Sequence, residues 1–472
     1  MEETLFSFLQ DYVAKDIYPF HMPGHKRNPA YLPQALPGLD ITELPDADNL
    51  NQPEGVILRL QERLARLFGA EQTFLTVNGS TGNNLAAITS ICGDGGAILL
   101  ARNAHRSAFG ALTLSGTRPV YMMPAMTPYG FCGGVSPADV EAKLNENPDI
   151  RAVFVTSPTY EGAVSDIKAI ADIAHAHNVP LIADEAHGAH MAFSDMFPRT
   201  ALACGADVVI HSLHKTMPFL TQTSVLHVQG NLVDRARLKK MISILQTSSP
   251  SYVFMAQIDY VVSMLEKDGK AIFAAYKERL LKCREACKAL TRIRLLDDAI
   301  VGQYNFFDLD MNKLVFLLPD AGLAANDFEL DLRDRFRVQL EMSGLLHSIG
   351  LTSPADTDEG IARLLAGVFA IDKEIGPNIP RAIQTPTVMP AAPDIVTTPR
   401  AAVNGAAEAI SLAEAEYRVS AAFLIPYPPG IPLVAPGERL TKDVLQKLML
   451  CRENGIPVVG LSDADNTVSV LL

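Results

Sequence analysis

Two polar side chains follow apolar runs of the sequence and could carry covalent chemistry. Lys215 comes shortly after the apolar run at 208–210, with His214 directly before it. A desolvated lysine beside a second potential cation loses its proton easily, and the neutral amine can form a Schiff base with an aldehyde. Asp184 follows another apolar run, at 181–183, where a carboxylate could keep a heterocyclic nitrogen protonated. Each also has an ordinary interpretation, because Lys215 could be a surface residue and Asp184 a helix cap.

A segment rich in glycine and hydroxyl groups could bind a phosphate. NGSTGNN, at 78–84, lies between an expected strand and an expected helix, so Ser80, Thr81 and Gly82 would face the positive end of that helix. The segment lacks the Gly-Lys-Ser of a P-loop, and helix capping alone would also explain it. His105, in NAHRS, could stack on an aromatic ring, or it could be a capping or packed side chain.

The order of these features along the chain connects them. Each of them stands at the carboxyl end of an expected strand: first the possible phosphate-binding segment, then His105, Asp184 and Lys215. Ligands of parallel sheets bind at that edge of the sheet. Together they predict a site for a phosphorylated aromatic aldehyde. Asp184, His187 and His190 could instead be metal ligands, but no further His or Cys stands at a supporting spacing, so we expect no metal.

Short apolar runs that alternate with amphipathic segments predict the sheet that would position these residues. The alternation indicates an α/β fold with a mostly parallel sheet covered on both faces. We expect strands at 73–77, 97–101, 120–124, 152–158, 181–186, 207–213 and 224–228, and helices at 57–67, 83–91, 105–114, 138–144 and 167–177. Beyond residue 231 the chain is predicted to be mainly helical, followed by a strand at 313–320 and helices around Phe328 and Ile361.

We expect five parts along the chain. They are an N-terminal arm at 1–50 with a short helix around Leu5, Leu9 and Val13, a large domain at 51–300, a small α+β domain at 301–375, a linker at 376–400 and a C-terminal domain at 401–472. The last part is predicted to hold a strand at 421–434 and a helix at 442–450.

The composition argues against several classes of protein and partner. The chain has 40 Lys and Arg against 53 Asp and Glu, a formal net charge of −13, which argues against nucleic acid as a partner. No run of 18 apolar residues is present, so we expect no membrane span, and the acidic start MEETL is unlike a signal peptide. The six cysteines are scattered without a CxxC pair, which fits a reducing cytoplasm.

Nine segments are distinctive: HMPGHK at 21–26, DITELP at 40–45, NGSTGNN at 78–84, NAHRS at 103–107, DEAHG at 184–188, HSLHK at 211–215, TSSPSY at 247–252, YPPGIP at 427–432 and PGE at 436–438. Together they resemble the Orn/Lys/Arg decarboxylases, fold-type-I enzymes that use pyridoxal 5'-phosphate (PLP), and in particular their shorter bacterial arginine-decarboxylase-like members. The resemblance extends over nearly the whole chain. It implies a three-layer large domain with a mostly parallel sheet, an N-terminal arm and smaller C-terminal α+β domains.

The resemblance also implies roles for individual residues. Lys215 would carry PLP as a Schiff base, Asp184 would pair with the ring nitrogen, and His105 would stack on the ring while His187 lies near its hydroxyl. The phosphate would be held by Ser80, Thr81, Gly82, Ser212 and His214. Across a homodimer interface, Thr247 and Ser248 would serve the cofactor of the neighbouring subunit. Substrate-side groups would be His21, His25, Lys26 and Glu438. An arm that packs on its partner subunit would equally explain HMPGHK.

The implied activity is the decarboxylation of a basic amino acid through a quinonoid intermediate, to give a polyamine precursor and carbon dioxide. Arginine is favoured over lysine and ornithine, and a proton would return to Cα from Lys215 or His214. The expected partners are a small cationic amino acid and a second copy of the chain, in a dimer or a tetramer. Two alternatives stay open: an aminotransferase or aldolase on the same fold, and a binding protein that keeps the fold without turnover.

Overall fold

The computed structural model of the chain describes residues 13–32, 36–44, 47–93, 95–319, 321–375, 392–427, 430–453, 455–462 and 466–472. The helix expected around Leu5 and Leu9 and most of the linker expected at 376–400 lie outside these residues. Among the described residues, no helix has both the length and the apolar character needed to cross a membrane.

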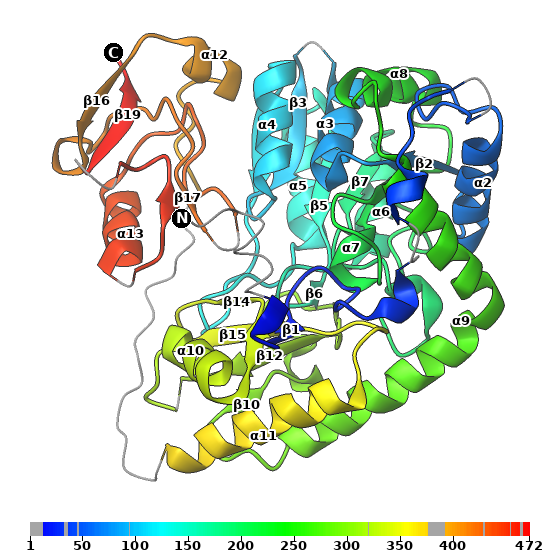
Figure 1. Ribbon diagram of the computed structural model, residues 1–472. Coiled ribbons are helices and arrows are strands. Elements are labelled where there is room, and N and C mark those ends of the chain that lie inside the picture. Colours follow the sequence, from blue (N-terminus) through cyan, green and yellow to red (C-terminus); the bar gives the residue numbers. More distant parts are fainter. Residues whose placement is uncertain are drawn as a thin grey trace, which may run out of the picture.

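A seven-stranded sheet forms the centre of the largest part of the molecule (Figure 1). The strand order is β2-β9-β8-β7-β5-β3-β4; β9 runs antiparallel to both of its neighbours, and the other four pairs are parallel. The predicted α/β fold with a mostly parallel sheet is therefore confirmed. The strands are β2 (Gln72–Thr76), β3 (Ala97–Ala101), β4 (Arg118–Met122), β5 (Ile150–Thr156), β7 (Leu181–Asp184), β8 (Val208–Ser212) and β9 (Ser224–Val228).

Helices cover both faces of this sheet because its central strands are apolar at nearly every position. In β3, Ile98 and Leu100 belong to the buried cluster of helices α3, α4 and α8, whereas Leu99 belongs to the cluster of α2, α5, α6 and α9. Successive side chains of a strand point to opposite faces, so three layers result. The helices are α2 (Val56–Phe68), α3 (Gly79–Cys92), α4 (Arg106–Ser115), α5 (Pro137–Glu146), α6 (Ile167–Ala176), α7 (Leu213–Thr216), α8 (Arg235–Leu245) and α9 (Tyr252–Cys287).

The segment NGSTGNN forms the first turn of a helix, and the prediction that the helix begins at Asn83 is wrong. Helix α3 begins four residues earlier, at Gly79, with Asn78 as its N-cap residue. Gly79 has a φ of 64°, a left-handed conformation that costs glycine little. The hydroxyl groups of Ser80 and Thr81 therefore lie at the positive end of a 14-residue helix.

A second, four-stranded antiparallel sheet lies at the far end of helix α9, at the bottom of Figure 1. The 36-residue helix α9 packs on both sheets, since Val262 and Phe273 share one buried cluster with Leu181 of the large sheet and Phe316 of the small one. The N-terminal arm joins this part, because β1 (Tyr18–Phe20) pairs in parallel with β13 (Val338–Leu340). The other elements are β10 (Arg294–Leu295), β12 (Lys313–Leu317), β14 (Met342–Ser343), β15 (His347–Leu351), α10 (Ala325–Phe336) and α11 (Asp358–Glu374).

Short elements complete the two larger parts. A two-residue strand after β5, β6 (Ala163–Val164), pairs antiparallel with β11 (Asp308–Leu309) and so ties the large sheet's loops to the small part. Short 3-10 helices span Pro29–Tyr31, Leu36–Leu39, Met191–Phe193, Asp298–Ile300 and Leu412–Glu414.

The C-terminal segment forms a third part with its own buried cluster. It consists of α12 (Pro399–Asn404), β16 (Ala407–Ser411), β17 (Ile425–Pro426), α13 (Lys442–Glu453), β18 (Val458–Val459) and β19 (Thr467–Leu471), with β16 antiparallel to β19 and β17 antiparallel to β18. It lies beside α4 in Figure 1, and the Nε of Arg400 donates to the carbonyl of Thr113 in that helix.

The strand predicted at 421–434 is wrong as a continuous element. Leu424 bridges Val434, so the chain folds back on itself between them. Four prolines in this run remove backbone N–H donors that a long strand would need, and two of them, Pro428 and Pro429, lie outside the described residues.

Residues of the HMPGHK segment pack between the two sheets. The N–H of Gly24 donates to the carbonyl of His214 (2.7 Å), and the carbonyl of Gly24 accepts from Oγ of Ser353 (2.6 Å). A Cβ at Gly24 would lie 2.5 Å from the carbonyl oxygen of Met217. Only glycine therefore fits between the arm and the turn that carries Lys215.

We expect Gly24→Ala to displace the 213–217 segment, because a backbone oxygen cannot give way as the end of a flexible side chain does. Overpacking of this kind costs about 1–3 kcal/mol of the free energy of unfolding. Urea denaturation would measure this loss. Gly38→Ala in the same arm is the matched control, since no atom lies within 4 Å of its Cβ position, and equal losses in both variants would contradict the packing argument.

Candidate active site

A cavity of about 430 Å³ opens at the carboxyl edge of the seven-stranded sheet. All three parts of the molecule contribute to its wall. The large part contributes the ends of β5, β7 and β8 and the first turn of α3. The small part contributes residues 342–345 and 347, and the C-terminal part residues 431–433. The structure brings together these predicted residues in its lining: Ser80, Thr81, His105, Asp184, His187, Ser212, His214 and Lys215. Gly82 lies in the same turn of α3 but is not part of the lining.

Lys215 lies in the short helix α7, directly after β8, and contacts a histidine. Its Nζ is 3.0 Å from Nε2 of His187. Burial lowers the pKa of Lys215, and the charge of Lys313 adds to this, while Asp184 and Glu341 act in the opposite direction. Burial likewise holds the pKa of His187 well below its ordinary value, with further contributions from the two lysines. The neutral imidazole can accept a hydrogen bond from the lysine, and the lysine can lose its proton readily.

Asp184 is held by an amide that links it to His105. Its Oδ2 accepts from Nδ2 of Asn84 (3.0 Å), and its Oδ1 accepts from the N–H of Ala186 (3.2 Å). The same Nδ2 of Asn84 donates to Oγ of Ser107 (2.9 Å), and that hydroxyl lies 2.8 Å from Nδ1 of His105. A continuous hydrogen-bonded chain therefore connects the carboxylate with the histidine.

The sequence analysis gave no role to Asn84 or Ser107. Asn84 lies four residues after Ser80, on the same face of α3, a spacing that could have pointed to the site. His105 is also the N-cap residue of α4, because its Nδ1 accepts the N–H of Ser107. Burial, followed by the charge of Lys215, lowers the pKa of His105 to about 4, so the ring is neutral at physiological pH.

Three serine hydroxyl groups cluster at the N-terminus of α3. Oγ of Ser80 lies 2.5 Å from Oγ of Ser212 and 3.2 Å from Oγ of Ser224. Nδ1 of His214 lies 3.1 Å from the carbonyl of Thr223, to which it donates, and burial lowers the pKa of His214 to about 4. Hydroxyl groups beside the positive end of a helix form a site suited to an anion.

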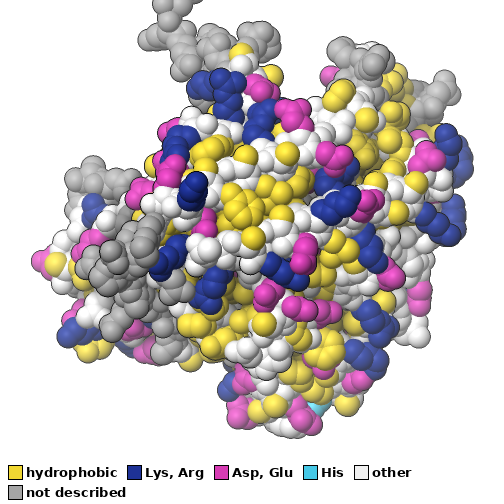
Figure 2. Space-filling view, turned by 90° about the horizontal axis from the view of Figure 1, so that it is seen from below, with side chains coloured by type: hydrophobic (Ala, Val, Ile, Leu, Met, Phe, Trp, Pro, Cys, Tyr) yellow, Lys and Arg dark blue, Asp and Glu magenta, His cyan; other side chains and the backbone are white. Residues whose placement is uncertain are grey.

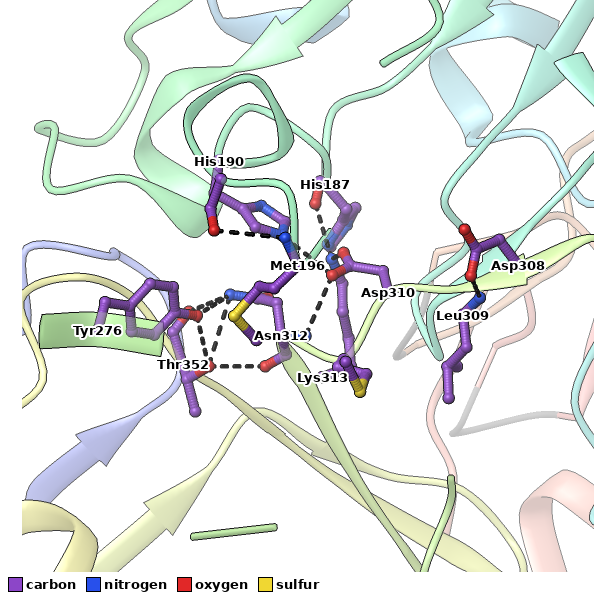
Figure 3. Close-up of polar contacts among 12 residues, drawn as sticks. His187, His190, Met196, Tyr276, Asp308, Leu309, Asp310, Asn312, Lys313 and Thr352 are labelled. Carbon is purple, nitrogen blue, oxygen red and sulfur yellow. Dashed lines mark hydrogen bonds and ion pairs between the residues drawn. The ribbon is translucent and has the colours of Figure 1, made fainter. Parts of the chain in front are cut away.

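A buried ionic network holds the turn that carries His187 (Figure 3). Nζ of Lys313 donates to the carbonyl of His187 (2.7 Å) and forms an ion pair with Asp310, whose Oδ1 lies 3.0 Å from Nε2 of His190. Burial would raise the pKa of Asp310, but the charges of His190 and Lys313 hold it well below its usual range. None of these three ionisable side chains has any exposed surface.

Asp310 and Lys313 come from the small part of the molecule, and neither was expected at the site from the sequence. Asp310 stands in the turn before the apolar strand β12, and Lys313 is the first residue of that strand. Two charged residues at the start of a buried strand were the signal in the sequence. The metal interpretation of Asp184, His187 and His190 finds no support here, since Nε2 of His190 faces Asp310 and Nε2 of His187 faces Lys215.

The four groups expected on the substrate side are not part of the cavity wall. His21, His25, Lys26 and Glu438 are absent from the lining. Nζ of the buried Lys26 donates to the carbonyls of His21 (3.1 Å) and Leu351 (2.8 Å), and Nδ1 of His25 accepts the N–H of Arg27. The arm thus packs within its own chain.

Glu438 supports the wall from behind. It forms an ion pair of 3.0 Å with Arg102, and both side chains are buried. Arg102 also donates to the carbonyls of Pro432 (2.5 Å) and Leu433 (3.0 Å), two residues that line the cavity. The ion pair therefore fixes the C-terminal part over the cavity.

Thr247 and Ser248 lie on the exposed connection between α8 and α9. They do not line the cavity of their own chain.

The cavity fits PLP. Buried polar atoms are usually paired, yet six atoms of lining residues have no hydrogen-bond partner within the described part of the chain: Oδ1 of Asn84, Oδ1 of Asn103, Oγ1 of Thr156, Nδ1 of His187, and Nδ1 and Nε2 of His347. A polar ligand would satisfy them. The serine cluster suits a phosphate, Asp184 a protonated ring nitrogen, and the amine of Lys215 an aldehyde.

We expect Lys313→Met to lower the free energy of unfolding by about 3–5 kcal/mol, because it leaves Asp310 as an uncompensated buried charge. The variant also releases the carbonyl of His187, so kcat should fall. Urea denaturation and turnover measure the two effects. Lys277→Met is the control, since its ion pair with Asp195 is exposed and should contribute less than about 1 kcal/mol. A Lys313 variant as stable as this control would contradict the proposed anchor.

Comparison with known proteins agrees with this site. The major domain of the Orn/Lys/Arg decarboxylase family matches residues 3–316, and the family's C-terminal domain matches residues 382–457. The arginine decarboxylase of Bacillus subtilis (strain 168) is 31% identical over 472 residues, which covers 98% of this chain and 96% of that protein. The arginine decarboxylase of Bacillus anthracis is 31% identical over 471 residues, which covers 98% and 95%.

Solved structures of low identity share the fold. Lysine decarboxylase A from Pseudomonas aeruginosa has a TM-score of 0.78 at 22% identity and covers 100% of this chain and 84% of its own. The constitutive lysine decarboxylase of E. coli has a TM-score of 0.72 at 23% identity, with 89% and 74% covered. Fold type I and PLP as the cofactor are thereby confirmed. The chain belongs to the Orn/Lys/Arg decarboxylase family and is a PLP-dependent amino-acid decarboxylase.

Proposed function

We propose that the enzyme converts L-arginine into agmatine and carbon dioxide, with lysine and then ornithine as less favoured substrates. The amine of Lys215, the carboxylate of Asp184 and the hydroxyl groups of Ser80 and Ser212 line one cavity, and this observation carries the proposal. The choice of arginine is supported by relatives named arginine decarboxylase at 31% identity, against 24–26% for relatives named lysine decarboxylase. Agmatine would serve as a polyamine precursor.

The residues that would hold the cofactor follow from the site. Ser80, Thr81, Gly82, Ser212 and His214 would bind its phosphate, together with the N–H groups of the first turn of α3. Asp184 would hold a proton on the ring nitrogen. His105 would stack on the ring, and His187 would lie near the ring hydroxyl. Lys215 would form the covalent link.

The reaction consumes one proton for each carbon dioxide released. When bound, the cofactor supplies an acceptor for the electron pair of the breaking Cα–carboxylate bond. Asp184, held by the hydrogen bonds from Asn84 and from the N–H of Ala186, would keep a positive charge on the ring nitrogen. Lys215 would return the proton to Cα, and His187 at 3.0 Å can exchange a proton with it; His214 is the alternative donor.

The fold itself does not distinguish decarboxylation from related reactions. A pyridoxamine-pyruvate aminotransferase and an L-threonine transaldolase share it, each at 16% identity. The two alternatives, an aminotransferase or aldolase and a binding protein without turnover, are outcomes of the next experiment.

We expect purified holoenzyme to release carbon dioxide from arginine with a higher kcat/KM than from lysine or ornithine. The assay measures carbon dioxide and keto acid in parallel for each amino acid. Keto acid in place of carbon dioxide would favour an aminotransferase. Protein that stays colourless with added PLP and releases no carbon dioxide would favour a binding protein.

We expect Lys215→Ala to lose the visible absorbance of bound PLP and the borohydride trapping of the cofactor on the protein, because no other amine replaces the link. Absorbance spectra and mass spectrometry of the reduced peptide measure this. The exposed Lys282, paired with Glu278 on α9, gives the control Lys282→Ala, which should keep both signals. Trapping that persists at full yield without Lys215 would remove the assignment.

We further propose a homodimer, or a tetramer built from it, in which Thr247 and Ser248 serve the cofactor of the neighbouring subunit. Both residues are exposed, and exposed apolar side chains lie on the adjoining helices: Val56 and Leu58 on α2, Ile244 on α8 and Tyr260 on α9. Figure 2 shows a different face, the lower one in Figure 1, where hydrophobic side chains gather among acidic and basic ones.

The division into parts at 1–50, 51–300, 301–375, 376–400 and 401–472 is also kept as a proposal. Separate buried clusters in the C-terminal part and beneath the small sheet support it. The cluster shared through α9 means that the large and small parts pack tightly. We place the enzyme in the cytoplasm, because all six cysteines are free.

A further inference from the structure

Two of the cavity-lining side chains are carboxylates, Asp184 and Glu161. Asp184 is engaged at the sheet edge by Asn84 and by the N–H of Ala186. Glu161 follows β5 in the turn 159–162, and the last residue of β5, Thr156, is the register neighbour of Asp184. The proposed function gives no role to this second carboxylate.

The backbone around Glu161 is fixed on both sides. The N–H of Gly162 donates to the carbonyl of Thr159 (3.1 Å), and the N–H of Thr159 donates to the carbonyl of Ala163 (2.9 Å). The carbonyl of Gly162 accepts the N–H of Asp310 (2.9 Å), from the strand pair that ties this loop to the small part. The side chain of Glu161 therefore has a defined position in the wall.

No full cation balances Glu161 among the residues that the structure describes. Its one ion-pair contact is with Nε2 of His347 at 3.8 Å, and burial lowers the pKa of His347 to about 4, so that ring is neutral. Burial raises the pKa of Glu161 to about 7. A buried carboxylate without a cation is costly, and a bound cation would relieve that cost.

The other carboxylate near this wall is already occupied. Glu341 accepts the N–H of Met22 (2.8 Å) through one oxygen and the hydroxyl of Tyr160 (2.7 Å) through the other. It does not line the cavity. Among the described residues, the carboxylate of Glu161 has hydrogen bonds only from the side chain of Thr159 and from its own backbone, so it is the lining acidic group that a cationic ligand could pair with.

We infer that Glu161 binds the cationic end of the substrate side chain, and that neutral His347 accepts a further N–H from it. The inference rests on the proposed function, since the substrate is the basic amino acid decarboxylated in this cavity. Met126, Phe131, Met342 and Leu345 line the same cavity and give its wall apolar surface for the methylene groups. A guanidinium presents five N–H donors in a planar fork, which suits a carboxylate and an imidazole together better than an ammonium does.

The test compares each basic amino acid with its uncharged counterpart: arginine with citrulline, lysine with norleucine, and ornithine with norvaline. Wild-type holoenzyme should prefer arginine to citrulline by about 100-fold or more in kcat/KM, since a buried charged group that loses its partner costs a few kcal/mol. In Glu161→Gln, kcat/KM for arginine should fall by about 100-fold, mainly through KM, while kcat/KM for citrulline stays within about twofold.

Three further measurements separate recognition from a structural role. The visible spectrum of PLP bound to Glu161→Gln should match that of the wild type. The Kd for agmatine, measured by calorimetry, should rise as the KM for arginine does. Glu146→Gln, at the exposed end of α5, is the control and should leave both substrates unchanged.

The inference would be overturned by a variant that loses arginine and citrulline activity equally, or that keeps its preference for arginine. Should Glu161→Gln fail to fold, a wild type that uses citrulline as well as arginine would overturn it on its own. If the wild type prefers lysine or ornithine, the arginine assignment fails. The role of Glu161 is then decided by comparing lysine with norleucine, or ornithine with norvaline, in the same way. An enzyme that releases no carbon dioxide from any of the three contradicts the proposed function, and agmatine binding then decides the role of Glu161.

Discussion

The contact between Lys215 and His187 is the interaction on which the rest of the site depends. Their nitrogens lie 3.0 Å apart in a cavity where burial disfavours charge on either group. Burial lowers the pKa of both, and the neighbouring Lys313 lowers them further. The lysine can therefore give up and regain a proton without leaving its place, as the proposed attachment of an aldehyde and the proposed protonation at Cα would both require.

Such a contact needs each partner to be held from outside the cavity. The turn that carries Lys215 is held by the N–H of Gly24 from the arm, and the turn that carries His187 is held by Lys313 from the small part. Buried charges are costly unless paired, and the Lys313–Asp310–His190 network satisfies this condition. The positions of the two turns that carry Lys215 and His187 are thus set by parts of the chain far away in sequence.

The two carboxylates of the cavity wall have different surroundings. One carboxylate, Asp184, is linked through Asn84 and Ser107 to His105, and the other, Glu161, faces a neutral histidine. The C-terminal part closes the wall through Arg102 and Glu438. The three parts of the molecule therefore contribute differently. The large sheet supplies most of the polar side chains of the cavity, the small part holds the turn of His187, and the C-terminal part closes the cavity wall.

The sequence alone determined the sheet and the residues at its carboxyl edge, because strand periodicity and strand ends are local properties. Lys215, Asp184, His105 and the serine-rich turn could be named for that reason. Two predictions from the sequence were wrong: the helix α3 starts earlier than expected, and residues 421–434 do not form one strand. In both segments the local preference for helix, strand or turn was ambiguous. Only the tertiary structure decided what pairs across long stretches of chain: Glu438 with Arg102, Lys313 with His187, and Glu161 with the cavity. Such contacts depend on how separate elements pack, and no local pattern records that packing.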